Sequence, residues 1–300
     1  MTSSRLCSVT SSRLSCMATS RSRLARTALG AFCLVAASAA LGAQESKPGW
    51  HFAPNANFAP GGTFAPAQAG FNLADVSSRR ELDLLPEGTK GLVWVGQCDG
   101  VTAQFESVVG AVIDHPKAFG FYLMDDPDPT GRWRKKCDAA NLRAEADWIH
   151  SRRPDAVTFI ALMNLGASDR PQFSPEYRPE ISHVDLFGVA PYPCRTEWRQ
   201  CDYDMIDRFV RAIEAAGISA DRIVPTFQTF GGGAWRTDSG GGYRLPSSSE
   251  MHAMFERWDR FVPAPVFDYA YSWGSQRSDH SLAASAELQG VFAQRNRDVR

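Results

Sequence analysis

The chain is poor in histidine and lacks the short motifs that mark several enzyme classes. Its six histidines include no His-Glu-x-x-His pair, so a histidine-based metal centre is not expected. No Gly-x-Ser-x-Gly segment is present, and no glycine-rich phosphate turn follows the first expected strand. Residues 237–242, Thr-Asp-Ser-Gly-Gly-Gly, are similar to a serine-protease nucleophile segment, but no matching histidine segment accompanies them. We therefore expect neither a metal nor a cofactor.

A full-length membrane-spanning run is also missing. The apolar stretch that ends at Ala43 is short for a bilayer span. It follows a region, residues 1–26, with five arginines and no acid, and small residues precede Gln44. This order is typical of a secretory signal peptide, with an uncleaved membrane anchor as the alternative. We expect residues 1–43 to be removed, and the protein to be secreted, periplasmic or extracellular without membrane attachment.

The remaining chain has no excess of basic residues. The whole sequence holds 32 basic and 33 acidic residues, and residues 1–43 take five of the basic ones and no acid. The 257 residues that remain carry 27 basic against 33 acidic residues, a net charge of about −6. This balance argues against a nucleic-acid partner. The length suits one large domain, and nothing in it indicates an oligomeric state.

Cysteine is sparse after residue 43, where only four remain. An even count in an exported protein predicts two disulfides. Cys194 and Cys201 flank one short loop and are expected to pair, which leaves Cys98 for Cys137. Neither spacing resembles a zinc ribbon.

Residues 44–67 show little regular pattern but repeat Phe-Ala-Pro three times at six-residue intervals. Regular proline excludes a helix or a central strand over most of such a segment. We expect a linker, or a strap that packs its phenylalanines on the domain.

From residue 68 onward, apolar runs of strand length alternate with helical patterns. The runs cover 69–74, 91–96, 118–124, 156–163, 184–190, 222–230 and 266–273. Strands this apolar on both faces suit a parallel sheet. Seven strands, with an eighth hidden in residues 49–66, predict a single-domain (β/α)8 barrel that covers 68–297. An open doubly wound sheet is the alternative.

The residues that follow these strands are acids, amides and aromatics. Barrel active sites lie at the carboxyl ends of the strands, and this mixture suits sugars, whose ring faces stack on aromatic side chains. The expected substrate-binding residues are Asp125, Asn164, Tyr192, Gln228, Tyr271 and Trp273.

Three acids follow one strand in the segment Asp125-Asp126-Pro-Asp128-Pro. Glycoside hydrolysis needs a carboxylic acid and an opposing carboxylate. Adjacent strand residues point to opposite faces, so only one of the first two acids should face the barrel mouth. We favour Asp126 as the acid/base, with Asp128 or Glu197 as its partner. Ordinary turn chemistry and a calcium site are the alternatives for this segment.

Five segments resemble exported bacterial (β/α)8-barrel proteins similar to glycoside hydrolases: GLVWVG, FGFYLMDDPDP, HVDLFGVAPYPC, RIVPTFQTFG and VFDYAYSWG. The resemblance covers nearly all of residues 68–295. In that group the strand that corresponds to 118–124 ends in Asp-Glu-Pro, and the strand that corresponds to 184–190 ends in Asp-Pro-Tyr-Pro. Here Asp126 stands at the position of the Glu, and Ala190 at that of the Asp. The Asn-Glu pair that follows the fourth strand in many barrel glycosidases is absent, because Asn164 has no acid after it.

These patterns lead to three functional hypotheses. The first is a secreted glycoside hydrolase that acts on a polysaccharide or glycan. The second is a non-catalytic carbohydrate-binding barrel, favoured by the loss of an acid at Ala190. The third is a structural cell-surface protein whose barrel mouth is closed by the Phe-Ala-Pro strap.

Overall fold

A closed ring of eight parallel strands forms the centre of the fold. The computed structural model describes residues 49–298. Each strand pairs with its neighbours in sequence, and the first pairs with the last. The strands are β1 (Trp50–Phe52), β2 (Leu73–Val76), β3 (Lys90–Trp94), β4 (Ala118–Asp125), β5 (Val157–Ala161), β6 (Leu186–Val189), β7 (Ile223–Gln228) and β8 (Phe267–Tyr271). The predicted barrel is confirmed, and the pairing of β1 with β8 rules out an open sheet.

The strands are buried on both faces, as their apolar sequences require. One cluster fills the inside of the ring with side chains from every strand: Phe52, Leu73, Leu92, Tyr122, Phe159, Leu186, Val224, Phe267 and Tyr269. A second cluster lies between the strands and the surrounding helices. Because alternate residues of each strand serve the two clusters, neither face can be polar.

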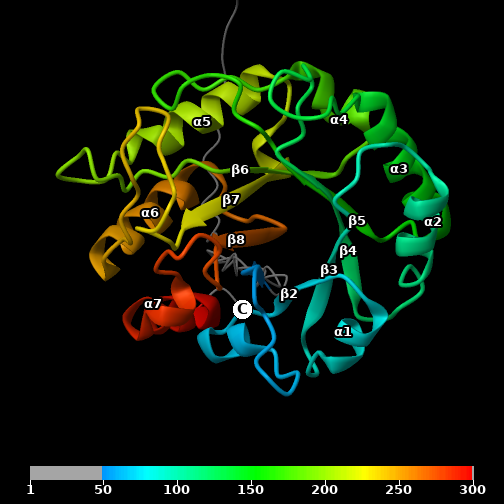
Figure 1. The fold of residues 1–300 in the computed structure, drawn as a ribbon, viewed down its shortest axis with the longest axis horizontal. Helices are drawn as coiled ribbons and strands as arrows, with labels where there is room; N and C mark the ends of the chain where they lie inside the picture. The colour runs from blue at the N-terminus through cyan, green and yellow to red at the C-terminus, as the bar shows by residue number, and fades with distance from the viewer. Residues whose placement is uncertain (1–48, 299–300) are drawn as a thin grey trace, which may run out of the picture. The chain divides into compact units, whose positions relative to one another are not determined.

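Helices surround the ring in the described part of the chain (Figure 1). They are α1 (Arg79–Leu84), α2 (Ala103–Gly110), α3 (Ala139–Arg152), α4 (Pro179–Ser182), α5 (Asp204–Ala215), α6 (Ser248–Phe261) and α7 (Ala286–Asp298), with short 3-10 turns at Ala65–Ala69, Pro175–Tyr177, Ala220–Arg222 and Leu282–Ala284. In α5, Ile206, Phe209, Val210 and Ile213 are buried, which matches the helical spacing of the sequence.

The Phe-Ala-Pro segment contributes to the barrel itself. Its first phenylalanine, Phe52, ends β1 and packs inside the ring, 5.0 Å between ring centroids from Tyr269. The barrel therefore begins before residue 68, inside the segment that was expected to be a linker or strap. The strand does lie within residues 49–66, where an eighth strand was expected. The strand escapes a periodicity search because it has only three residues and a proline follows at Pro54.

The expected signal peptide, residues 1–43, lies outside the described residues. Within 49–298, no helix combines the length and the apolar character that crossing a membrane requires.

Candidate active site

A cavity of about 750 Å³ lies at the carboxyl ends of the strands. In a parallel barrel these ends share one face, so loops far apart in sequence meet there. Residues at or just beyond seven strand ends contribute to its wall: Asn55, Asp75, Trp94, Asp125, Asp126, Leu162, Ala190, Tyr192, Tyr271 and Gln276. The residues after β1, Pro54 to Phe58, form part of this wall, so the segment expected to be a strap shapes the cavity.

Two adjacent acids at the end of β4 both line the cavity. The expectation that only one would face the mouth rested on strand alternation, but β4 ends at Asp125. Asp126 adopts a left-handed backbone conformation with a φ of 49°, so the two-residue period of the strand no longer applies to it. Asp125 Oδ1 accepts a hydrogen bond of 2.9 Å from the Tyr122 hydroxyl. Asp126 Oδ2 lies 3.4 Å from Arg134 Nη2.

The surroundings of this pair disfavour the ionisation of both carboxyls at once. Burial, followed by the charge of Asp125, raises the pKa of Asp126 to about 7, and Arg134 opposes this only in part. Burial also raises the pKa of Asp125, although the Tyr122 hydrogen bond and Arg134 favour its ionised form. Two neighbouring carboxyls in a partly dry site cannot easily both ionise. The arrangement therefore suits one proton donor beside one carboxylate.

A third carboxylate, Asp75 on β2, reaches the same cavity. Its Oδ2 accepts a 3.2 Å hydrogen bond from the Asn55 backbone amide, and its own amide donates to Asn57 Oδ1 at 2.6 Å. Burial raises its pKa above the ordinary value despite the Asn55 hydrogen bond. Asp75 was not among the predicted site residues. It directly follows the expected strand 69–74, and this position was the signal that could have identified it.

Aromatic side chains form much of the remaining wall. Tyr192 and Tyr271, both predicted, line the cavity with their rings stacked 5.8 Å apart. Trp94 and Trp235 also line it but were not predicted. Trp94 ends β3 and remains 37% exposed. The sequence placed it inside the expected strand 91–96, so only the structure shows that it lies at a strand end.

Comparison with solved structures identifies the same barrel in carbohydrate-active proteins. A chitinase from Rhizomucor miehei matches with a TM-score of 0.51 at 13% identity, over 85% of this chain and 100% of the other. A chitinase-like agglutinin from Robinia pseudoacacia gives 0.53 at 11% identity, over 82% and 98%. A family GH128 endo-beta-1,3-glucanase from Sorangium cellulosum gives 0.51 at 10% identity, over 81% and 97%.

The chain shares its (β/α)8 barrel with these proteins. Identities this low establish the architecture alone. No protein-family model matches the chain, and a search of curated proteins finds no match. The expected resemblance to glycoside hydrolases is thus supported at the level of the barrel.

Three predicted binding residues lie outside the cavity wall of this barrel. Asn164 Oδ1 accepts hydrogen bonds from the amides of Gly166 and Gln172, at 3.0 and 2.9 Å, and so shapes its own loop. Trp273 is only 3% exposed and packs against Phe71. Both follow strand ends, but the loops turn their side chains into local structure.

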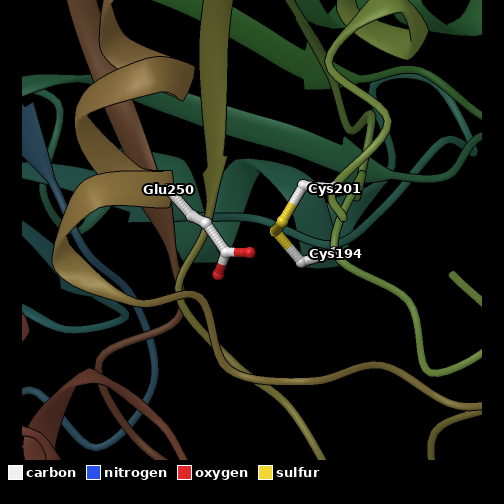
Figure 2. A group of neighbouring side chains, drawn as sticks. All are labelled: Cys194, Cys201 and Glu250. Atoms are coloured by element: carbon white, nitrogen blue, oxygen red, sulfur yellow. A yellow bond between two sulfur atoms is a disulfide. The ribbon is translucent and has the colours of Figure 1, made fainter. Parts of the chain in front are cut away.

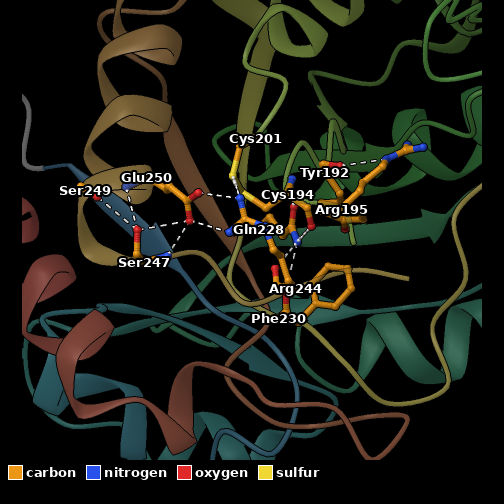
Figure 3. The surroundings of a disulfide bond; sticks show 10 residues. All are labelled: Tyr192, Cys194, Arg195, Cys201, Gln228, Phe230, Arg244, Ser247, Ser249 and Glu250. Atoms are coloured by element: carbon orange, nitrogen blue, oxygen red, sulfur yellow. Dashed lines mark hydrogen bonds and ion pairs between the residues drawn. A yellow bond between two sulfur atoms is a disulfide. The ribbon is translucent and has the colours of Figure 1, made fainter. Parts of the chain in front are cut away.

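Gln228 is the third of these residues, and it is fully buried. Its side-chain oxygen accepts from the Cys194 amide at 2.8 Å, and its nitrogen donates to the carbonyls of Cys194, Phe230 and Arg244 (Figure 3). Every polar atom of the amide is therefore used to join the loops after β6 and β7. None remains for a ligand.

The two predicted partner acids are also placed in loops rather than in the cavity wall. Asp128 accepts hydrogen bonds from the amides of Thr130, Gly131, Trp133 and Arg134. Burial opposes ionisation there, but these bonds and the Thr130 hydroxyl outweigh it and hold the pKa of Asp128 well below its usual range. This is the turn chemistry that the sequence left open. The aspartates of this segment form no three-ligand cluster, so the calcium alternative gains no support.

Glu197 lies on an exposed loop. The hydroxyls of Thr237 and Ser239 each donate to its Oε1 at 2.6 Å. Burial acts in the opposite direction, but these bonds lower the pKa of Glu197 to about 2. The Thr-Asp-Ser-Gly segment thus binds a loop carboxylate, and Glu197 is not available as a proton donor to the cavity.

Both predicted disulfides are present, Cys98–Cys137 and Cys194–Cys201. Among residues 49–298, one group of side chains has the proximity that a metal ion would need, namely Cys194, Cys201 and Glu250 (Figure 2). Its two sulfurs are bonded to each other, and Arg244 Nη1 donates to Glu250 Oε2 at 2.7 Å. The disulfide and the ion pair occupy these groups (Figure 3), so the cluster does not suit a metal.

Proposed function

We propose that the protein is an exported glycoside hydrolase that cleaves a polysaccharide or glycan by carboxylate acid/base chemistry. The observation that supports this most directly is the pair Asp125–Asp126 in a cavity walled by tyrosine and tryptophan. Aromatic faces offer stacking surfaces for sugar rings, while the acids supply the groups that glycosidic cleavage needs. Two disulfides are compatible with export.

Asp126 is the proton donor in this proposal. With a pKa of about 7, it holds a proton over much of the neutral range and can deliver it to the glycosidic oxygen as the bond to the anomeric carbon breaks. Asp125, hydrogen-bonded by Tyr122, provides the negative charge that keeps this proton in place. Asp75, on β2, is a further carboxylate of the same cavity and is available to act on a water molecule or on the anomeric carbon.

A glycan screen on the mature protein tests the proposal, with reducing-end release and binding measured on the same samples. Asp126→Asn should lower the rate of release by roughly 10²–10⁴-fold and leave binding largely intact, because the amide keeps the shape of the acid. Asp155→Asn is a matched control, since the Asp155 side chain is 81% exposed and forms an ion pair with Arg153. Release that is equal in Asp126→Asn and wild type would contradict the assignment.

A non-catalytic carbohydrate-binding barrel is the second candidate. Ala190 lies in the cavity wall at the position where the resembling barrels carry an acid. Its methyl group offers no carboxylate to the site. One of the matching structures is itself described as an agglutinin. Binding without any release in the screen, unchanged by Asp126→Asn, would favour this candidate.

A further inference from the structure

The cavity has a cationic side opposite its acids. Arg277 lines the wall, and its guanidinium carbon lies 4.3 Å from the ring centroid of Trp235. Within residues 49–298, the Arg277 guanidinium has no carboxylate oxygen within 4.0 Å. The other cavity arginine, Arg134, differs because it pairs with Asp126. Arg277 is therefore the lining cation that is free to receive an anion.

The backbone around Arg277 is held in place from three directions. Asp279 Oδ1 accepts hydrogen bonds from the amides of Gln276 and Arg277, at 3.0 and 2.8 Å. The Arg277 carbonyl accepts a 3.0 Å bond from the amide of Ala234 in the preceding loop. A Cβ at Gly233 would approach that carbonyl to 2.4 Å, so glycine allows the two loops to meet. The stacked pair Arg277–Trp235 thus rests on a supported loop junction.

The position of this junction relative to the acids follows from the strand order. Asp125 and Asp126 follow β4, whereas Arg277 follows β8, four places away in a ring of eight. The strand that carries the acids and the strand that leads to Arg277 therefore lie on opposite sides of the ring. A chain of sugars with its scissile bond at the acids would reach Arg277 with a neighbouring unit.

We infer that the neighbouring unit carries a carboxylate, so that the ligand is a uronic-acid-containing polysaccharide. A guanidinium presents a planar fork that matches a carboxylate with two parallel hydrogen bonds, and Trp235 beside it supplies an apolar surface for the sugar ring. The inference rests on the proposed carbohydrate site and adds the charge of its ligand. Arg277 is exposed, so a neutral glycan would leave this cation to the solvent and make no use of its charge.

Affinity electrophoresis in gels that contain polygalacturonate, alginate or glucuronoxylan tests the inference. Each polymer is paired with its carboxyl-reduced form, which keeps the chain and removes the charge. Wild type should bind at least one acidic polymer about tenfold or more tightly than its reduced form. The Arg277→Gln variant should bind the acidic polymer and its carboxyl-reduced form equally, with the affinity that wild type shows for the reduced form. The Arg277→Lys variant should retain part of the preference for the acidic polymer.

Arg152→Gln is the matched control. Arg152 also stacks on a tryptophan, 3.6 Å from the Trp148 ring centroid, but it lies on α3, outside the cavity. Its removal should leave the preference for the acidic polymer unchanged. Equal wild-type binding to acidic and reduced polymers, no binding to any acidic polymer, or an unchanged preference in Arg277→Gln would each overturn the inference.

Reducing-end release separates this inference from the proposed hydrolysis. An acidic preference that depends on Arg277, without release by wild type, would support the inference and reject the hydrolase. Release that depends on Asp126, without any preference for acidic polymers, would support the hydrolase and reject the inference about the acidic ligand.

Discussion

At the scale of single residues, the site depends on how one carboxyl acts on the next. Partial burial of Asp126, whose side chain is 43% exposed, and the charge of the neighbouring Asp125 raise its pKa, while Arg134 favours the ionised form. The two neighbours therefore act on the same pKa in opposite directions. This opposition can be measured without knowledge of the natural substrate, on any glycan that the protein cleaves.

The first prediction concerns the pH dependence of kcat/KM. Activity should fall as pH rises through about 7, because Asp126 then loses the proton that it donates. Asp125→Asn removes a negative charge, lowers the pKa of Asp126 and should move this fall to lower pH. Arg134→Gln removes a positive charge and should move it to higher pH. Shifts of both variants in the same direction would contradict the role of Asp126.

At the scale of elements, the sequence predicts where strands end better than it predicts where side chains point. Asp126, Tyr192 and Tyr271 were expected at the mouth and do line the cavity. Gln228 has the same kind of position, at the last residue of β7, yet it is turned into a buried network. The difference depends on hydrogen bonds with loops that are distant in sequence, which composition and periodicity do not report.

The two disulfides also belong to the scale of elements. Each of the four cysteines lies in a connection between a strand and the next helix. Cys98 and Cys137 follow β3 and β4, and Cys194 and Cys201 lie between β6 and α5. Their effects should differ with the length of chain that each closes, 39 residues against 7. In the chain-entropy description the longer loop gives about 4 kcal/mol and the shorter about 2 kcal/mol.

Replacing Cys98 and Cys137 together by alanine should therefore lower the free energy of unfolding more than replacing Cys194 and Cys201. Urea unfolding of the two double variants beside wild type gives the comparison. An equal loss in both variants would mean that local packing, rather than the length of the closed loop, determines the contribution of each bond.

At the scale of the whole molecule, strand and helix alternation was sufficient to predict the barrel. The strand that closes the barrel, β1, could only be expected somewhere within residues 49–66, because it has just three residues and shows no periodic pattern. Its pairing with β8 depends on tertiary contacts: Phe52 is fully buried between Phe267 and Tyr269, at 6.1 and 5.0 Å. Local propensity contributes little to a strand of this length.

The closure of the barrel should consequently depend strongly on Phe52. Phe52→Ala should cost about 3–5 kcal/mol of unfolding free energy, because it leaves a cavity inside the ring. Phe58→Ala provides the comparison, since Phe58 lies in the same segment but is only partly buried, and it should cost clearly less. Urea denaturation of both variants measures the difference. Equal costs would show that β1 is not required to hold the ring closed.

The left-handed backbone at Asp126 also limits how the active site can change. Aspartate and asparagine tolerate a positive φ better than most residues, because their short polar side chains bond locally. Glutamate at this position would place a longer side chain on an unfavourable backbone. A protein engineer who wants a longer acid here must therefore reshape the loop along with the residue.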